Sequence, residues 1–261
     1  MNDQPTPEMR DALPMLDVLG LPVLALPWGE ALEAFESMIL HRDFHRVAWL
    51  NAHCSNVAVN NGAYREALRR FLLLPDGVGV DLAAIVRHGR PFPDNLNGTD
   101  FVPDLLRHVT QPLRVALIGA QQGVAELAAA ALARHAPQHE VRALAHGFFT
   151  SAEESDILAR LASWQPDILL VAMGVPRQEL FIGNRIDASH CTLAFAVGAL
   201  FDFQAGTIQR APALVRSLRL EWMYRLSREP ARLWRRYLLG NPNFIFRILR
   251  DWLARRNRLK G

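Results

Sequence analysis

The segment from about residue 112 to residue 205 alternates short apolar runs, glycine-bearing turns and helical stretches. This alternation predicts parallel strands that are joined by helices covering the sheet. We expect strands at 114–118, 141–145, 167–172 and 192–197, and helices at 124–134, 152–163 and 177–186. Ser151 is the expected N-cap of helix 152–163, with Glu154 placed for a capping box. Ligands of such sheets bind outside the carboxyl ends of the strands, so the turns after these strands are the first candidates for function.

The first part of the chain, up to about residue 111, predicts two more short strands and several helices. The expected elements are strands at 47–50 and 72–74, and helices at 53–71 with a break near Gly62, at 80–88 and at 100–109. The apolar segment 13–28 contains Asp17, Gly20 and three prolines, which favours strands and turns. The expected fold class is therefore α/β, with a Rossmann-like parallel sheet flanked by helices.

The end of the chain carries a strong positive charge. Residues 219–261 hold eleven arginines and one lysine against three acidic residues, a net +9, whereas the whole chain is +3. Such asymmetry predicts contact with an anionic partner, which is phosphate, membrane or nucleic acid. Aromatic residues interleave with the arginines, which is typical of helices in a membrane interface. The plainer alternative is a solvated charged face over packed aromatic rings.

Two breaks divide this basic segment, which we treat as a C-terminal helical appendage. Glu229-Pro230 and Gly240-Asn241-Pro242 both contain residues that interrupt helices. The appendage is therefore expected to fold as two or three short helices.

One carboxylate follows a predicted strand in a turn. Asp76 lies in Pro75-Asp76-Gly77, and the glycine lets the backbone approach a ligand closely. A carboxylate at such an edge can act as a general base by accepting a proton from an attacking hydroxyl group. Because Asp-Gly is a common turn pair, an Asx-turn or an N-cap is the simpler explanation of this motif taken alone.

Three further turns hold candidate ligand contacts. Gly119 follows a strand in a loop that matches a phosphate-binding loop only in part, and an ordinary turn is the favoured explanation. Gln178 and Glu179 are expected in the first turn of a helix, near the sheet edge. Asp202 stands between two phenylalanines and is costly to bury unless it bonds a ligand or an arginine such as Arg210.

Other classes of site and protein are excluded by what the sequence lacks. Cys54 and Cys191 form no CxxC motif, so neither a disulfide framework nor a zinc site is expected, and a reducing compartment fits. The chain has no HExxH and no DxD motif, and we predict no essential metal and no cofactor. His53 and His146 are the histidines near predicted strand ends. We expect neither a transmembrane helix nor a signal peptide.

Taken together and in this order, the motifs resemble those of the WecG/TagA/CpsF family of bacterial glycosyltransferases, glycosyltransferase family 26, over roughly residues 16–246. Each motif alone is weak, but nine or ten in register are highly specific. The motifs are Leu50-Asn51-Ala52, Pro75-Asp76-Gly77, Asn97-Gly98-Thr99-Asp100, Leu117-Ile118-Gly119, His146-Gly147-Phe148-Phe149, the run 173–179, the run 201–206, Arg210-Ala211-Pro212, the run 221–226 and the run 229–236.

The resemblance implies an inverting glycosyltransferase that uses a UDP-sugar and a polyprenyl-diphosphate-linked sugar acceptor. Such enzymes build cell-surface polymers of the cell envelope, such as teichoic acid linkage units, enterobacterial common antigen and exopolysaccharide. The donor sugar would be of the N-acetylmannosamine type or of the glucose or glucuronate type. The catalytic core would span residues 1–218, with an acceptor and base half to about 111 and a UDP-binding half from about 112. Residues 219–261 would form the appendage that binds membrane and acceptor.

The resemblance also assigns roles to single residues. Asp76 would be the general base, with Asn51 and Thr99 beside it. The residues that would bind UDP are Gly119, Gly147, Phe148, Gly174, Gln178 and Asp202. The residues that would hold diphosphate in place of a metal are Arg225, Arg232 and Arg235.

Three departures from the family pattern bear on the substrates. Trp49 stands where the family often has a threonine, so a hydroxyl group is absent and the donor sugar is left open. Phe148 replaces a tyrosine and keeps a stacking face without the hydroxyl group. Asn95-Leu96-Asn97 stands where some members have an arginine. The run Leu-Asn-Ala-His-Cys at 50–54 is closer to the exopolysaccharide branch than to the teichoic acid branch.

Two other functions fit part of the sequence. A nucleotide- or nucleic-acid-binding regulator with a basic tail would explain the charge, but the tail lacks a helix-turn-helix and an aromatic strand platform. A hydride-transferring Rossmann enzyme would need a GxGxxG motif, which the chain lacks. The expected partners are a UDP-sugar, a polyprenyl-diphosphate-linked sugar and an anionic membrane surface, without nucleic acid, and a homo-oligomer is compatible with the sequence. The expected location is cytoplasmic, peripheral on the inner face of the plasma membrane.

Overall fold

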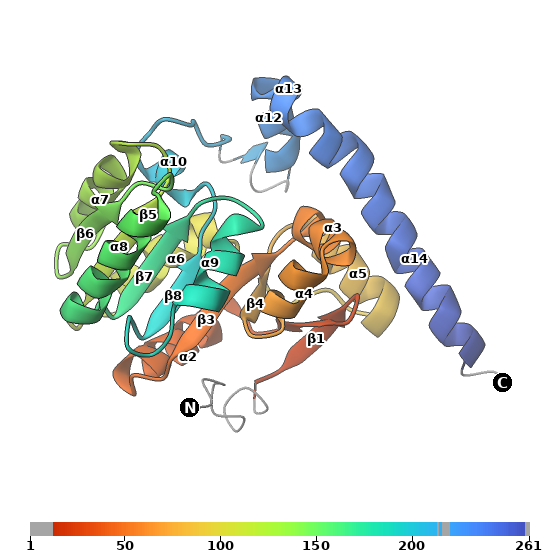
Figure 1. Ribbon diagram of the computed structural model, residues 1–261. Helices are drawn as coiled ribbons and strands as arrows, with labels where there is room; N and C mark the ends of the chain where they lie inside the picture. The colour runs from red at the N-terminus through yellow and green to blue at the C-terminus, as the bar shows by residue number, and fades with distance from the viewer. Residues whose placement is uncertain (1–12, 213, 216–219, 259–261) are drawn as a thin grey trace.

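The computed structural model describes residues 13–212, 214–215 and 220–258, and within them an α/β fold is built around one eight-stranded sheet (Figure 1). Its strands are β1 (Met15–Val18), β2 (Leu21–Leu24), β3 (His45–Leu50), β4 (Leu72–Pro75), β5 (Arg114–Gly119), β6 (Glu140–Ala145), β7 (Ile168–Ala172) and β8 (Leu193–Ala196). They lie in the order β1-β2-β4-β3-β8-β7-β5-β6, and only β1 pairs antiparallel to its neighbour. The predicted Rossmann-like parallel sheet flanked by helices is confirmed.

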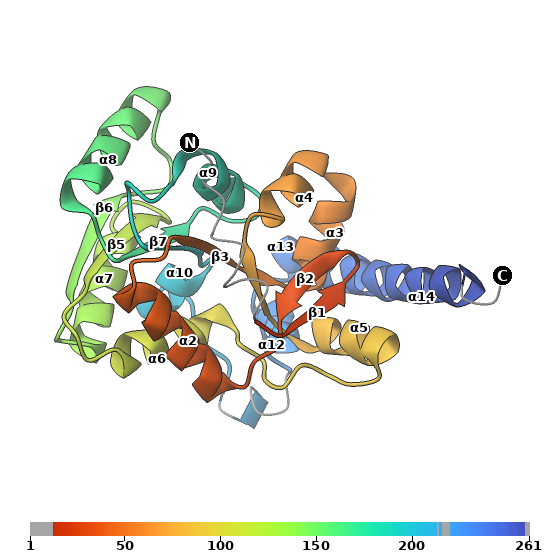
Figure 2. The same ribbon diagram turned by 90° about the horizontal axis from the view of Figure 1, so that it is seen from below.

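Helices cover both faces of the sheet (Figures 1 and 2), because alternate side chains of a strand point to opposite faces. One face packs against α2 (Trp28–Leu40), α6 (Gly98–His108), α7 (Val124–His135) and α10 (Leu200–Gln204). The other packs against α3 (Ala52–Asn60), α4 (Gly62–Leu68), α5 (Val78–His88), α8 (Ser151–Trp164), α9 (Arg177–Arg185) and α14 (Gly240–Arg258). In β3, Val47 and Trp49 enter the first core, whereas Ala48 and Leu50 enter the second.

Local capping explains one expected boundary and corrects another. The helix predicted over 53–71 is divided at Asn61, whose side chain caps α4 by accepting a hydrogen bond from the Tyr64 N–H. The N-cap of α8 is Thr150 instead of Ser151, and its hydroxyl oxygen accepts from the Glu153 N–H while the Glu153 carboxylate accepts from the Thr150 N–H. The prediction of Ser151 was wrong by one residue, because serine and threonine are both good caps and each has an acidic residue three positions on.

The basic tail forms α12 (Glu221–Arg228), then α13 (Pro230–Trp234), the π-helical turn η1 (Arg235–Leu239) and α14. The break expected at Glu229-Pro230 is confirmed, since Glu229 leaves the helical conformation with φ of −131°. The prediction of a break at Gly240-Asn241-Pro242 is wrong, because helical structure continues from residue 230 to residue 258. A π-helical turn immediately before Pro242 widens the backbone where a proline ring would otherwise clash with a carbonyl group.

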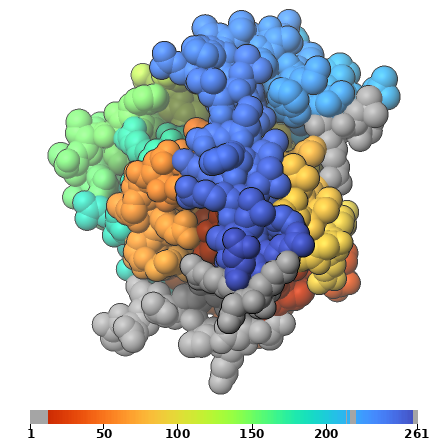
Figure 3. Space-filling view, turned by 90° about the vertical axis from the view of Figure 1, so that its right-hand side faces the viewer, coloured from red at the N-terminus to blue at the C-terminus, as the bar shows by residue number. Residues whose placement is uncertain are grey.

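α14 lies along the outside of the core, between α3 and α5 (Figure 3). Its Phe244 and Ile248 are buried in the second core. Phe244 packs against Gly79 of α5, where an added Cβ would lie 3.3 Å from the ring. The side chain of Asn56 on α3 donates a hydrogen bond of 2.7 Å to the carbonyl oxygen of Gly240. The tail is therefore packed onto the core along one helical face.

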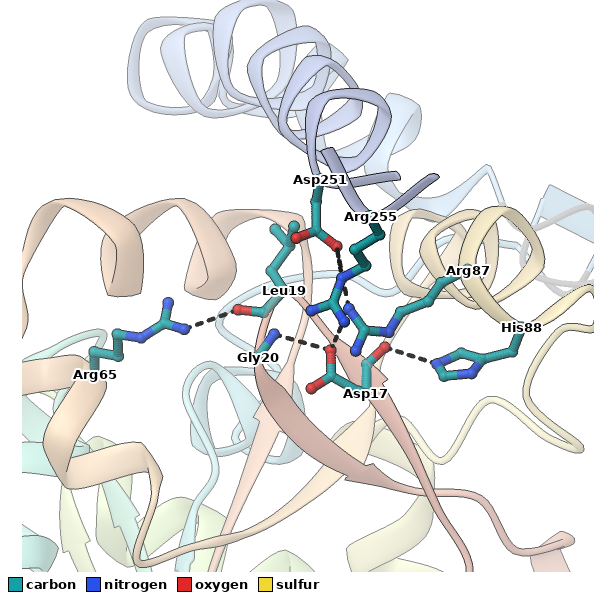
Figure 4. Close-up of polar contacts among 8 residues, drawn as sticks. All are labelled: Asp17, Leu19, Gly20, Arg65, Arg87, His88, Asp251 and Arg255. Atoms are coloured by element: carbon teal, nitrogen blue, oxygen red, sulfur yellow. Dashed lines mark hydrogen bonds and ion pairs between the residues drawn. The ribbon is translucent and has the colours of Figure 1, made fainter. Parts of the chain in front are cut away.

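Charged contacts hold the far end of α14 (Figure 4). Arg87 at the end of α5 contacts both Asp17 of β1 at 2.9 Å and Asp251 of α14 at 3.1 Å. The Arg255 side chain donates to the same Asp251 carboxylate at 2.9 Å. One partly buried guanidinium thus joins the first strand, α5 and the C-terminal helix.

We predict that Phe244→Ala detaches α14 from the core, because truncation of a buried phenylalanine typically costs about 3–5 kcal/mol. Hydrogen exchange should rise along residues 240–258, and the melting temperature should fall. Phe246→Ala is the matched control, since its ring is 63% exposed on the same helix. Equal exchange in the two variants would contradict docking through Phe244.

Candidate active site

The turns selected from the sequence meet at one edge of the sheet. β3 to β8 are parallel, so their carboxyl ends share that edge. The helices that follow β5 and β7 leave to opposite faces, as do those that follow β3 and β8. Such reversals open crevices in which ligands of α/β proteins bind. The candidate residues at this edge are Asn51, Asp76, Gly119, Gly147 and Gly174.

Asn51 and Asp76 are in direct contact. The Asn51 Nδ2 donates to Asp76 Oδ2 at 3.0 Å, and the Asn51 Oδ1 accepts from the Cys54 N–H at 3.0 Å and so caps α3. The N-cap of α5 is Gly77, which shows that the N-cap explanation of Asp76 is wrong. The backbone N–H of Asp76 donates to the Leu50 carbonyl and extends the pairing of β3 and β4. The Asn51 amide, which caps α3, therefore holds the Asp76 carboxylate at the edge of the sheet.

The segment before α6 contacts the turn that follows Asp76. Gly77 has φ of 90°, and its N–H donates to Asn95 Oδ1 at 2.7 Å. Trp49 is almost fully buried, its indole N–H donates to the Leu96 carbonyl, and its ring would lie 3.0 Å from a Cβ added to Gly98. Trp49 therefore packs inside the core, and its side chain contacts the segment that leads to Thr99.

Gln178 and Glu179 form a buried polar unit behind the sheet edge. The Gln178 Oε1 accepts from the backbone N–H groups of Gly174 and Gly198, both at 3.1 Å, and its Nε2 donates to Glu179 at 3.0 Å. Both side chains are buried. Gln178, expected as a nucleotide contact, is placed so that it shapes the turns after β7 and β8. Glu179 fixes the orientation of the amide, because only an acceptor can take its N–H.

The turns after β5 and β6 pack backbone against backbone. Gly119 has φ of 136°, and an added Cβ would lie 2.3 Å from the last carbonyl oxygen of β7, so only glycine fits. The Gly147 N–H donates to the Ala120 carbonyl at 2.9 Å. Phe148 then projects with 62% of its surface exposed, and the Arg177 guanidinium lies 6.0 Å from its ring centre. The exposed ring leaves a flat face for a planar group.

Two arginines of the tail lie beside Asp202. Burial raises the pKa of Asp202, whereas the charge of Arg232, a hydrogen bond with Thr207 and the charge of Arg225 lower it. The Arg225 guanidinium lies 5.5 Å from the ring centre of Phe203. These three predicted site residues therefore lie within range of one another's charge, while the Arg232 guanidinium itself contacts Glu229 at 2.6 Å.

Arg210 joins the tail to the core. Its two terminal nitrogens donate to the carboxylate of Asp100 at 2.5 and 3.0 Å, and one lies 4.0 Å from Glu221. The pair of Asp202 with Arg210 that the sequence suggested is therefore wrong, because Arg210 binds Asp100. Burial raises the pKa of Glu221, Arg210 opposes that rise, and the charges of Asp100 and Asp76 add to it. The start of α12 thus lies near the Asp76 carboxylate.

Sequence reasoning missed Arg236. Arg235 is exposed and lies over the ring of Trp234, with 5.3 Å to the ring centre. Arg236 faces α3, because its charge acts on His53 of that helix. Burial is the larger cause and the Arg236 charge the smaller one that together lower the pKa of His53 to about 4. Neighbouring helical residues point about 100° apart, so spacing alone does not show which of two consecutive arginines faces the core.

Two further observations concern metals and membranes. Within residues 13–212, 214–215 and 220–258, no three His, Cys, Asp or Glu side chains gather as a metal-binding group. Among the same residues, no helix combines the length and the apolar composition that crossing a bilayer requires. The cysteines Cys54 and Cys191 are buried and free.

We predict that Glu179→Gln alters the pH dependence of stability. Burial raises the pKa of Glu179 from 4.5 to about 7. The folded protein therefore holds this proton more tightly than the unfolded chain, and the wild type should lose roughly 3 kcal/mol of unfolding free energy between about pH 4.5 and pH 7. Glu179→Gln cannot ionise, so urea unfolding at both pH values should lack this loss. Glu126→Gln, at an exposed position of α7, is the control, and a wild-type slope in Glu179→Gln would refute the assignment.

The chain is similar in sequence to known proteins over most of its length. A family model described as "Glycosyl transferase WecG/TagA/CpsF family" matches residues 16–258. The chain is 31% identical over 195 residues, 74% of each protein, to the N-acetylglucosaminyldiphosphoundecaprenol N-acetyl-beta-D-mannosaminyltransferase of Bacillus spizizenii. It is 27% identical over 248 residues, 93% of this chain and 95% of the relative, to the protein of the same name from Staphylococcus aureus. The chain therefore belongs to the WecG/TagA/CpsF family of glycosyltransferases.

Proposed function

We propose that the protein is an inverting glycosyltransferase that moves a sugar from a UDP-sugar to a polyprenyl-diphosphate-linked sugar. The names of its relatives specify transfer of an N-acetyl-β-D-mannosaminyl group to N-acetylglucosaminyl-diphosphoundecaprenol. We therefore assign a donor of the N-acetylmannosamine type, with glucose or glucuronate as the alternatives. The observation that carries the proposal is the contact of Asn51 with Asp76 at the carboxyl edge of the sheet, the same edge at which the glycine turns lie.

Asp76 is the proposed general base. Its carboxylate accepts the proton of the acceptor hydroxyl group, whose oxygen then bonds to the anomeric carbon while the bond from that carbon to UDP breaks. Attack from the side opposite UDP inverts the anomeric centre. Asn51 orients the carboxylate through the 3.0 Å hydrogen bond, and Thr99 lies at the start of α6, beside the Asp100 that binds Arg210.

UDP is proposed to lie over the glycine turns. Open space beside Gly174 lets a nucleotide approach the backbone closely, while Gly119 and Gly147 let the neighbouring turns pack together beneath it. The exposed Phe148 ring offers a stacking face for uracil, and Asp202 is available for a ribose or uracil hydrogen bond. Gln178 acts by holding the turn at Gly174.

The tail arginines are proposed to neutralise diphosphate. The charges of Arg225 and Arg232 act on Asp202, and Arg236 faces α3. Guanidinium groups bind phosphate oxygens through two hydrogen bonds, which suits a leaving UDP and makes a metal unnecessary. Arg235 is exposed beside Trp234 and is better placed for the acceptor or for lipid phosphate.

We also propose peripheral attachment to the inner face of the plasma membrane through residues 219–261. Each basic residue near an anionic surface contributes about 1 kcal/mol, so several of the twelve suffice. This location would place the site where polyprenyl-linked acceptors are found.

Asp76→Asn should lower the transfer rate by roughly two or more orders of magnitude, as loss of a general base commonly does. Binding of UDP should persist, because the amide keeps the shape of the side chain. Transfer from UDP-N-acetylmannosamine to a short-chain lipid diphosphate acceptor measures the rate. The control is Asp43→Asn before β3, at the opposite edge of the sheet. A near-normal rate for Asp76→Asn would remove this residue from the mechanism.

Turnover should survive excess EDTA, because arginines take the role of a metal in this proposal. A rate abolished by EDTA and restored by Mg²⁺ would show that the enzyme uses a metal after all.

Arg225→Ala should lower the rate on the order of 100-fold, the effect of losing one group that stabilises transition-state charge. Arg228→Ala, three residues further on α12 and hydrogen-bonded to Gln209, is the matched control.

A further inference from the structure

One face of α5 is apolar and exposed. Val78, Leu82 and Ile85 are 46%, 36% and 46% exposed, and their spacing of four and three residues places them on one helical face. Asp76 lies two residues before the first of them, so this stripe begins at the rim of the candidate active site. Contiguous exposed apolar side chains of this kind mark interaction surfaces.

α14 carries a second stripe with the same spacing. Ile245, Leu249 and Trp252 are 41%, 46% and 37% exposed, while Phe244 and Ile248, on the neighbouring face of the helix, are buried in the core. The helix is therefore apolar both toward the core and toward solvent. Packing against the core accounts only for the first of these faces.

The two stripes lie on adjoining helices (Figure 3). α14 packs against α5, and Trp252 lines the same hollow of about 360 Å³ as Ala83 and Val86 of α5. The α14 stripe therefore lies on the side of that helix that faces α5. We call the six residues of the two stripes the two-helix surface: Val78, Leu82, Ile85, Ile245, Leu249 and Trp252.

The rim of the two-helix surface is basic. Residues 230–258 contain eight arginines and one acidic residue, Asp251. That carboxylate already binds Arg87 and Arg255 (Figure 4). Arg250 and Arg256 are exposed on α14, and Arg90 is exposed just beyond α5. An apolar centre with a cationic rim complements a bilayer whose hydrocarbon lies beneath anionic phosphate groups.

We propose that the two-helix surface enters the interface of an anionic bilayer, so that α5 of the core contacts lipid together with the C-terminal helix. This goes beyond attachment through the tail, because a helix that begins at the Asp76 turn becomes part of the contact. The carboxylate is then held at the level of the lipid phosphates. The inference rests on the proposed function only for the lipid-linked substrate that this position would serve.

The test is co-sedimentation with vesicles of phosphatidylcholine and phosphatidylglycerol. Leu82→Glu/Ile85→Glu leaves the tail intact and should lower the bound fraction by about tenfold or more, because carboxylates are repelled by the surface and poorly inserted. The matched control, Leu40→Glu/Leu127→Glu, changes two leucines on α2 and α7 that are 47% and 55% exposed, and it should bind like the wild type. Melting temperatures near the wild-type value must accompany both variants, and single substitutions replace the pair if it is unstable.

Wild-type vesicle binding by Leu82→Glu/Ile85→Glu would overturn the proposal, since the tail alone would then account for attachment. Unchanged vesicle binding with a lower oligomeric state in light scattering would also overturn it and would assign the surface to a second copy of the chain. Transfer to a water-soluble acceptor distinguishes a failure of this inference from a failure of the proposed transferase function. Leu82→Glu/Ile85→Glu should keep that activity and lose it only with acceptor embedded in vesicles, whereas loss with the soluble acceptor would count against this inference.

Discussion

The hydrogen bond between Asn51 and Asp76 is the contact on which the account of the site depends. It follows from the register of β3 and β4, which places Leu50 opposite Pro75. The next residue of each strand then leaves the sheet at the same point. Asn51 is held by capping α3, so its amide nitrogen has one direction left, toward the carboxylate. The orientation of the proposed general base is thus set by a strand register and a helix cap.

The other half of the site is built by a different device. Gln178 binds two backbone N–H groups and is itself fixed by Glu179, so one buried side chain shapes two turns. The cost of burying Glu179 appears as its raised pKa. Arg210 then ties the tail to the start of α6 through Asp100. Core and tail are consequently joined by contacts between charged side chains.

Much of the fold could be predicted because parallel strands must alternate with helices, and each strand end was marked by glycine or asparagine. Asp76 could be selected for the same reason. Contacts between distant segments could not: nothing near Arg210 indicates Asp100 as its partner, and spacing does not separate Arg235 from Arg236. Pro242 also misled, because a π-helical turn that no local motif announces lets the helix continue.

The exposed stripe on α5 could not be foreseen for a related reason. Val78, Leu82 and Ile85 fit the core-facing pattern of a buried helix, and only the packed structure shows that α5 uses another face for its core. The same helix therefore links the chemistry at its first turn to a surface suited to lipid. The proposed lipid-linked acceptor would explain why a core helix keeps both.

A crystal structure of the protein with UDP would show whether Asp76 faces the donor. We predict diphosphate between the Gly119, Gly147 and Gly174 turns and the guanidinium groups of Arg225 and Arg232, with the Asp76 carboxylate open toward the sugar position. UDP bound elsewhere, or an Asp76 side chain that points away from the diphosphate into the protein, would contradict it.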